Sequence, residues 1–126
     1  MDHTDFEIWL GKYGDAWEGR DATSGMELFT PDALYYWTPF EAPKRGRGGI
    51  HAAFHDANTG QKDIEFSSEI LATIGNRGIA RWWCSLVRLR DQRALKFDGI
   101  FQVDFTENGL CEEFREWWHS DEELDA

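Results

Sequence analysis

The chain has 126 residues, 41% hydrophobic and 29% charged, a composition typical of one globular domain with a sizeable core. Its formal net charge of −11 argues against binding to nucleic acid or anionic membranes, because both need a basic surface. The N-terminus is polar, and no apolar run approaches the roughly 20 residues of a membrane-spanning helix. We therefore expect a single domain over residues 1–126, without a signal peptide or membrane segment.

Hydrophobic periodicity divides the chain into a helical first half and a second half of strands. Apolar residues at helical spacing predict helices over 4–19, 24–29 and 46–58. Segments rich in β-branched and aromatic residues predict strands over 33–38, 64–74, 79–89, 95–105 and 110–119. Helices followed by an antiparallel meander form an α+β pattern. The ordered core is expected to span about residues 4–119, followed by a solvated acidic tail at 121–125.

A carboxylate near the C-terminus is the strongest candidate for chemistry. The Asn-Gly turn at 108–109 reverses the chain between the last two strands, and pairing across it places Gly99 opposite Glu116. Opposed residues share a face, so Glu116 is predicted on the apolar face, where Gly99 leaves room in front of it. Burial would raise the pKa of such a carboxyl group, as in acid–base catalysts. The alternative is a structural ion pair with Arg81 or Arg88.

The same pairing rule suggests further residues around Glu116. One row across the sheet would hold Glu69 and Glu116, separated by two small residues, which makes Glu69 a candidate second carboxylate, the favoured alternative being a solvent-facing strand residue. Tyr13 on the first helix and Tyr36 on the first strand are candidates to donate a hydrogen bond to a substrate oxygen, the alternative being core tyrosines. The candidate walls of a substrate cavity are aromatic: Trp17, Trp82, Phe97, Phe101, Phe114 and Trp118.

No motif in the sequence indicates a metal or a cofactor. His51 and His55 have the i, i+4 spacing of a metal-binding pair, but no third ligand is evident, so an exposed helix flank is the favoured interpretation. A Gly-rich phosphate loop and a nucleophile elbow are both missing from the sequence. The predicted pairing places Cys84 and Cys111 on opposite sheet faces, so we expect reduced thiols and a cytoplasmic protein.

Four short motifs accompany this order of elements. They are Phe29-Thr30-Pro31-Asp32-Ala33, Pro39-Phe40, Gly46-Arg47 with Ile50, and Arg115-Glu116-Trp117-Trp118. Together they resemble the nuclear transport factor 2-like superfamily, and within it the SnoaL-like branch, over roughly residues 4–119. The resemblance implies a cone-shaped α+β barrel, in which three N-terminal helices pack on a highly curved antiparallel sheet around a cavity.

This superfamily includes ketosteroid isomerases, polyketide cyclases, limonene-epoxide hydrolases, dehydratases and non-catalytic domains. Glu116 matches the acid on the last strand of the epoxide hydrolases, but Trp83 stands where their partnering acid belongs. Thr38 and Val103 occupy the places of the two isomerase acids, and His119 that of the cyclase acid. The resemblance therefore supports Glu116 as a catalytic residue without naming the reaction.

We expect a cofactor-independent enzyme that uses acid–base chemistry on a small, largely apolar molecule, as a lyase, isomerase, cyclase or hydrolase. The alternative is a ligand-binding or dimerisation module of the same fold without turnover. An apolar set on the opposite sheet face would be unusual on a monomer. Its members are Trp83, Val87, Ile100, Cys111 and Trp117. Because members of this fold commonly dimerise through that outer face, we expect a homodimer.

Overall fold

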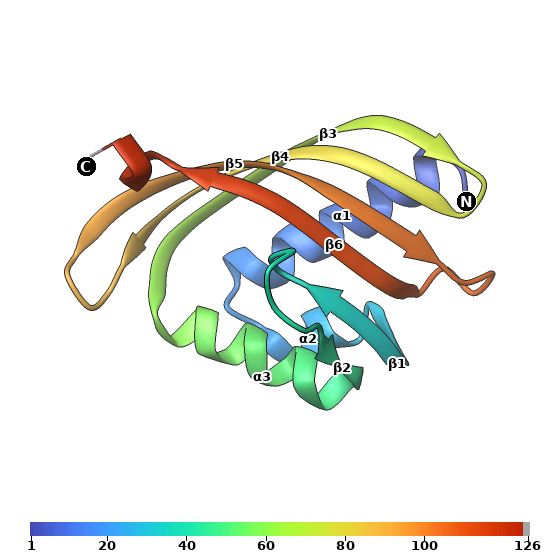
Figure 1. Ribbon diagram of the computed structural model, residues 1–126, viewed down its shortest axis with the longest axis horizontal. Coiled ribbons are helices and arrows are strands. Elements are labelled where there is room, and N and C mark those ends of the chain that lie inside the picture. Colours follow the sequence, from blue (N-terminus) through green and yellow to red (C-terminus); the bar gives the residue numbers. More distant parts are fainter. Residues whose placement is uncertain (125–126) are drawn as a thin grey trace.

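A curved six-stranded sheet arches over three helices (Figure 1). This computed structural model describes residues 1–124. The helices are α1 (His3–Glu18), α2 (Ala22–Met26) and α3 (Gly46–Thr59), with a short 3-10 helix η1 (Asp121–Leu124) after the last strand. The strands are β1 (Phe29–Tyr36), β2 (Lys44–Arg45), β3 (Gln61–Ile74), β4 (Arg77–Arg88), β5 (Arg93–Phe105) and β6 (Cys111–Ser120). The expected α+β arrangement is confirmed.

The sheet order is β2-β1-β6-β5-β4-β3. All neighbouring strands are antiparallel except β1 and β6, which run parallel. The short strand β2, which pairs with β1, lies between the predicted strand 33–38 and the predicted helix 46–58, where no strand was predicted. Because β6 lies between β1 and β5, the last strand of the chain occupies the interior of the sheet and faces the helices.

The first helix packs against the concave face of the sheet and contributes to the core. The Asp2 carboxylate accepts a hydrogen bond from Asp5 N at 2.8 Å and so satisfies a free N–H group of the first turn. Buried residues recur along α1 at helical spacing, and they include Phe6, Trp9, Leu10, Tyr13 and Ala16. The Trp9 ring meets Phe29 and Phe105 edge-on, with centroids 5.8 and 5.4 Å apart. α1 is therefore anchored on both β1 and β5.

The last hairpin is offset by two residues from the predicted pairing. Gly99 lies opposite Trp118, and Phe101 lies opposite Glu116. The reversal is wider than predicted, because residues 106–110 form it and a 2.9 Å backbone hydrogen bond closes it. Side chains alternate with a period of two, so this offset changes the partner of Glu116 but keeps it on the predicted face. The prediction that Gly99 clears space in front of Glu116 was wrong.

A bulge in β3 moves Glu69 off the concave face. The pairing with β4 shifts between Ile70 and Ala72, which leaves Leu71 as an extra residue. Glu69 consequently pairs with Arg81 and is exposed on the convex side of the sheet. One extra residue inverts the faces of the strand segment beyond it. The predicted row of two carboxylates is therefore not formed.

Both cysteines are buried and unpaired. Cys111 lies in the core, so its predicted place on the outer face was wrong. The β5–β6 pairing shifts next to it, and the extra residue Glu112 turns Cys111 inward. Burial raises the pKa of the Cys84 thiol to about 12, so that thiol stays protonated and unreactive at neutral pH.

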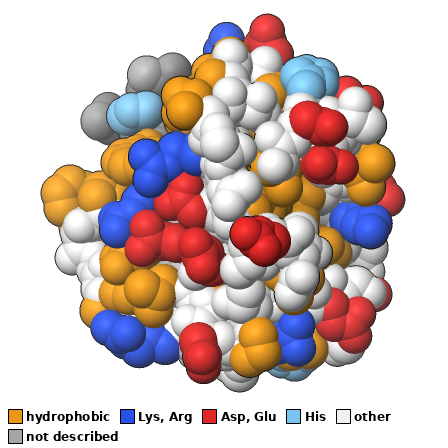
Figure 2. All heavy atoms as spheres, turned by 90° about the vertical axis from the view of Figure 1, so that its right-hand side faces the viewer, with side chains coloured by type: hydrophobic (Ala, Val, Ile, Leu, Met, Phe, Trp, Pro, Cys, Tyr) orange, Lys and Arg blue, Asp and Glu red, His pale blue; other side chains and the backbone are white. Residues whose placement is uncertain are grey.

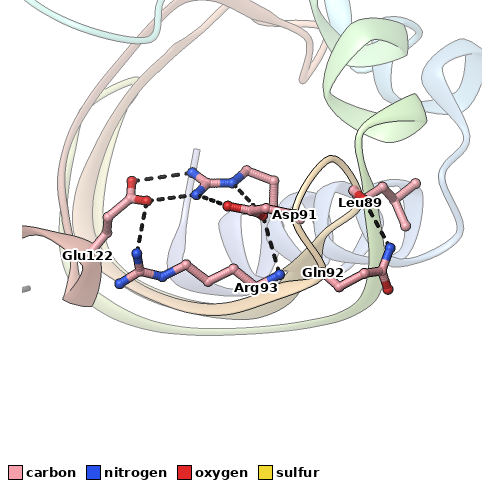
Figure 3. Close-up of polar contacts among 6 residues, drawn as sticks. Leu89, Asp91, Gln92, Arg93 and Glu122 are labelled. Atoms are coloured by element: carbon pink, nitrogen blue, oxygen red, sulfur yellow. Dashed lines mark hydrogen bonds and ion pairs between the residues drawn. The ribbon is translucent and has the colours of Figure 1, made fainter.

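The acidic segment after β6 belongs to the fold as far as it is described. Arg88 contacts Asp91 and Glu122 at 2.7 Å each, and Arg93 lies 3.5 Å from Glu122 (Figure 3). These ion pairs fasten η1 to the turn between β4 and β5. η1 is therefore ordered, although the side chain of Asp121 stays exposed. Residue 125 of the predicted solvated tail lies outside the described residues.

Charged side chains of both signs are interspersed at the end of the molecule that carries the β3–β4 and β5–β6 turns (Figure 2). The face in view presents no continuous basic patch of the kind that binds nucleic acid. Over the described residues, none of the helices combines the length and the apolar character that crossing a membrane requires.

Gly99→Ala is expected to lower the free energy of unfolding by about 1–3 kcal/mol, the usual cost of overpacking. An added Cβ would overlap the carbonyl oxygen of Trp117 and lie 2.7 Å from Trp82 Nε1. Gly11→Ala is the control, because Gly11 lies in α1 with open space beside it, and alanine there should stabilise by up to about 1 kcal/mol. Urea unfolding measures both. A Gly99 variant as stable as the wild type would contradict this packing.

Candidate functional site

A cavity of about 370 Å³ lies between the helices and the concave sheet face. This volume is within the range of small-molecule sites. Half of its lining residues are aromatic, and the apolar rings are Trp17, Trp37, Phe54, Trp82, Phe97 and Trp118. The polar side chains that line it are Tyr13, Asp21, Tyr35, Asn58, Gln61 and Glu116. The cavity therefore suits a largely apolar molecule with a few hydrogen-bonding groups.

Glu116 is the buried acid of this cavity, with 9% of its surface exposed. Its Oε1 atom accepts a hydrogen bond of 3.0 Å from the hydroxyl of Tyr35. Burial raises the pKa of Glu116 to about 8, and the bond from Tyr35 lowers it only in part. Oε2 has no hydrogen-bond partner among the described residues and is not fully occluded, so it meets the cavity. At neutral pH this carboxyl group is mostly protonated.

The alternative of an ion pair between Glu116 and an arginine is wrong. Arg81 contacts Asp98 at 2.6 Å, and Arg88 contacts Asp91 and Glu122. A cation next to Glu116 would have lowered its pKa. Because Arg81 and Arg88 form ion pairs with other carboxylates, burial determines the protonation state of Glu116.

The tyrosine beside Glu116 is Tyr35, whereas the sequence pointed to Tyr36. β1 runs parallel to β6 and pairs Tyr35 with Phe114, so Tyr35 shares the concave face with Glu116. The rings of Tyr35 and Phe114 stack with centroids 4.9 Å apart. Tyr36 points to the convex side, where the Arg115 guanidinium lies 3.9 Å from its ring centroid. Adjacent strand residues face opposite ways, and only the pairing with distant β6 decides which tyrosine faces inward.

Tyr13 is placed where the sequence predicted it, on the cavity side of α1. Its hydroxyl lies close enough to that of Tyr35 for each to influence the pKa of the other. Burial raises the pKa of both tyrosines well above the ordinary value, and the nearby charge of Glu116 raises them further. Both hydroxyls therefore stay protonated and can act as donors.

Four of the six predicted aromatic wall residues line the cavity: Trp17, Trp82, Phe97 and Trp118. Phe101 and Phe114 are fully buried behind the wall instead. Sequence reasoning missed Trp37, which stacks on Trp118 and accepts a hydrogen bond from its indole at 3.0 Å. Trp37 immediately follows β1 in the chain, two residues after Tyr35, so the same strand periodicity could have indicated it.

Sequence reasoning also missed Asn58 and Gln61 at the junction of α3 and β3. Asn58 falls four residues after Phe54 and eight after Ile50, which places it on the inward stripe of α3. That spacing was visible in the sequence. Gln61 lies just beyond the helix, where helical spacing does not indicate the direction in which its side chain points.

The histidine pair of α3 shows no sign of a metal site. The rings of His51 and His55 are parallel with centroids 6.2 Å apart, and His51 Nε2 lies 3.4 Å from Thr23 Oγ1. Within residues 1–124, no group of three or more His, Cys, Asp or Glu side chains is gathered as metal ligands would be.

The raised pKa of Glu116 predicts how stability depends on pH. Between about pH 4.5 and 8 the unfolded chain loses the Glu116 proton while the folded chain keeps it. This carboxyl group should therefore lower the free energy of unfolding as pH rises through that window, by up to about 1.4 kcal/mol per pH unit, with no further loss above it. Glu116→Gln removes this contribution, so its stability relative to the wild type should increase with pH.

Urea unfolding of both proteins between pH 4.5 and 8.5 measures this difference. Glu69→Gln is the matched control, because Glu69 is exposed and its variant should follow the wild-type curve. A constant difference between wild type and Glu116→Gln over the whole range would mean that Glu116 has an ordinary pKa.

Comparison with known proteins gives one family and a set of related structures. The chain matches the family model described as a SnoaL-like domain over residues 10–114. It is similar to the solved structure of SalBIII, described as an epoxide hydrolase/cyclase-like enzyme with a role in pyran ring formation in the polyether salinomycin. The TM-score is 0.82 at 15% identity, over 94% of this chain and 93% of that chain.

A second similar structure is a Bacillus subtilis protein provisionally described as an isomerase, with a TM-score of 0.79 and 18% identity over 94% of this chain and 90% of that chain. At such identities the likeness shows a common fold. A search of curated protein sequences finds no significant match. The family model covers most of the chain, and the three helices and curved sheet of the structure are the arrangement that the resemblance implied. The chain belongs to the SnoaL-like family of the nuclear transport factor 2-like superfamily.

Proposed function

We propose that the protein is a cofactor-independent enzyme in which Glu116 acts as a general acid toward a small, neutral, largely apolar molecule. The observation that carries this proposal is the Glu116 carboxyl group, buried and mostly protonated at neutral pH, with Oε1 bonded to Tyr35 and Oε2 open to the cavity. A buried acid with a pKa near the working pH is suited to proton transfer. The family supports an activity of the cyclase or isomerase type.

The arrangement suits transfer of a proton from Oε2 to a carbonyl, ether or epoxide oxygen of the substrate. Tyr35 would strengthen its hydrogen bond to Oε1 as the carboxylate forms, and so stabilise the charge that develops. In a cyclisation, a hydroxyl group of the same molecule attacks carbon as the C–O bond breaks, and its proton returns to the carboxylate. Glu116 then begins and ends protonated, and the net reaction is an isomerisation.

The aromatic wall would hold the apolar body of the substrate and keep water out. Trp17 and Trp82 contact each other with centroids 5.7 Å apart, and Trp37 stacks on Trp118. Exclusion of water strengthens the electrostatic interactions of the acid with the reacting oxygen. The similarity to an epoxide hydrolase/cyclase-like enzyme and to a provisionally assigned isomerase supports a ring-forming or isomerising reaction.

Loss of the acid should abolish most of the turnover. With hydroxy-epoxides and unsaturated ketones as trial substrates, Glu116→Gln should lower kcat by about two to four orders of magnitude, the range for losing a general acid. Tyr35→Phe should lower kcat less, because the carboxyl group remains. Tyr36→Phe and Glu69→Gln are matched controls on the convex face and should keep wild-type turnover.

The pH profile separates an acid role from a base role. As a general acid, Glu116 should support kcat/KM below about pH 8 and lose it as the pH rises above that value. Activity that instead increases through pH 8 would assign Glu116 as a base. Full turnover in Glu116→Gln would remove it from the chemistry altogether.

The second candidate is a ligand-binding module without turnover. The observation that favours it is that β4 contributes Trp82 but no acid to the described cavity wall. Trp83, which the resemblance places at the partnering acid of the epoxide hydrolases, lies on the convex face paired with Asp98. In that case Glu116→Gln should change the affinity for cavity ligands by only about 1 kcal/mol, the value of one hydrogen bond.

We also propose that the protein forms a homodimer through the convex sheet face. Trp117 is 42% exposed there and pairs with Ile100, while Trp83 lies 4.7 Å beneath the Arg81 guanidinium. With half-buried Val87 nearby on β4, these residues form an apolar strip among charges. A second copy of the chain would cover it.

Trp117→Glu should therefore convert the dimer into a folded monomer, since it places an unpaired charge in the contact. Phe40→Glu is the control, because Phe40 is 92% exposed in the segment between β1 and β2, away from the convex face. Analytical ultracentrifugation measures both. A Trp117 variant that sediments like the wild type would place the contact elsewhere.

The two free, buried thiols support a reducing compartment, and we propose the cytoplasm. Burial raises the pKa of both cysteines, which keeps them as small apolar side chains of the core. Neither thiol takes part in the proposed chemistry.

A further inference from the structure

We propose that Asn58 and Gln61 form a second polar subsite, which binds a neutral oxygen function of the substrate about one helical turn from Glu116. This inference rests on the proposed function in that both use the same cavity, but it concerns binding alone. It narrows the substrate class to uncharged, largely apolar molecules that carry two oxygen functions, one at each subsite.

Asn58 is a buried amide without a protein partner. Only 6% of its surface is exposed, and with Glu116 it makes up the buried polar residues of the described chain, tyrosines aside. Its backbone oxygen accepts a 2.8 Å hydrogen bond from Arg20 Nε, which fixes the position of the residue. Its side-chain amide has no hydrogen-bond partner within residues 1–124, yet its atoms are not fully occluded. The space that they meet is the cavity, which Asn58 lines.

Gln61 presents a second donor in the same cavity. Its Oε1 atom accepts a hydrogen bond of 2.9 Å from the indole nitrogen of Trp17. An indole N–H can only donate, so the oxygen of this amide must face Trp17 and the NH2 group must point away from it. That NH2 group has no partner among the described residues, and Gln61 lines the cavity. Two amides are therefore available to a ligand there.

The spacing along α1 relates the two subsites. Tyr13 adjoins the Tyr35–Glu116 pair, and Trp17, four residues later, holds Gln61. One turn of helix rises about 5.4 Å, so the two oxygen functions of the ligand should be separated by a distance of that order.

The charges of the cavity exclude an anionic ligand. Asp21 and Glu116 are the carboxyl groups in its wall, Glu116 being mostly protonated at neutral pH, and the wall contains no Lys, Arg or His within the described residues. Asp21 is bound to α2 through Ser24 N and Oγ, at 3.0 and 2.6 Å. A carboxylate or phosphate would find no cation there, whereas a hydroxyl or carbonyl group can use the amides.

A matched pair of probes tests the subsite: 2-decalone, with one oxygen, and 6-hydroxy-2-decalone, with a second oxygen across the ring system. Calorimetric titration should show that the wild type binds the hydroxy-ketone about five- to tenfold more tightly, the effect of one neutral hydrogen bond. Asn58→Leu keeps the number and branching of the side-chain heavy atoms, and it should remove this preference while changing the affinity for 2-decalone less than about twofold. Asn76→Leu, in the β3–β4 turn, is the control and should keep the preference.

Thermal unfolding separates a binding role of Asn58 from a structural role. If its side chain stabilised the fold, substitution would lower the unfolding midpoint. Because the Asn58 amide has no partner in the described part of the chain, leucine should leave the unfolding midpoint unchanged or raise it. Asn58→Ala, which cannot overpack, should also lose the preference. Equal affinity of the wild type for the two ketones, no binding of either, or a preference that survives in both Asn58 variants would overturn the proposal.

Neither titration needs turnover, so the outcomes can be distinguished from those of the catalytic test. If Glu116→Gln keeps full activity while the wild type shows the preference that Asn58→Leu loses, the acid role fails and the subsite stands.

Discussion

The burial of the Glu116 carboxyl group against the Tyr35 hydroxyl is the interaction around which the site is built. The two residues are 81 positions apart, and the parallel pairing of β1 with β6 brings them together. Keeping a carboxyl group away from water costs free energy, and the fold meets that cost by retaining the proton instead of adding a cation. The arginines that could have neutralised it bind carboxylates on the convex face and at the β4–β5 turn. The acid role proposed for Glu116 depends on this separation of its carboxyl group from the arginines.

Strand irregularities decide which side chains reach the cavity, and they also set the limit of sequence reasoning. An offset of two residues in the β5–β6 hairpin left the predicted face of Glu116 intact, because side chains alternate with a period of two. A single extra residue, Leu71, had the opposite effect and sent Glu69 to the convex side. The helices, the strand order of the meander and the family could be predicted, since hydrophobic periodicity and turn residues are local signals. Bulges depend on packing against distant elements and leave little trace in the sequence.

The residues that sequence reasoning missed have a common origin. A local sequence pattern does not distinguish Tyr35 from Tyr36. Pairing of β1 with β6 determines which of the two faces the cavity. Asn58 continues the inward stripe of α3, but a polar residue on such a stripe is easily taken for the end of the helix. In both cases the periodicity was present in the sequence. Periodicity alone shows no sign of the cavity, which allows a polar side chain to point inward.

The same rings that stabilise the fold set the properties of the acid. Phe114 stacks on Tyr35 at 4.9 Å and on Tyr13 at 5.6 Å, and Phe101 lies 4.7 Å from Phe114. Neither phenylalanine lines the cavity, yet together they form the apolar backing that keeps water from Glu116 and holds both tyrosines in place. Substitutions in this layer would therefore change packing and the pKa of Glu116 together. Glu116 and Asn58 are buried polar residues in the wall of the cavity, whereas a closed core would place apolar side chains at both positions. The cavity therefore gives their polar atoms a space in which a ligand, rather than the protein, would be the hydrogen-bond partner.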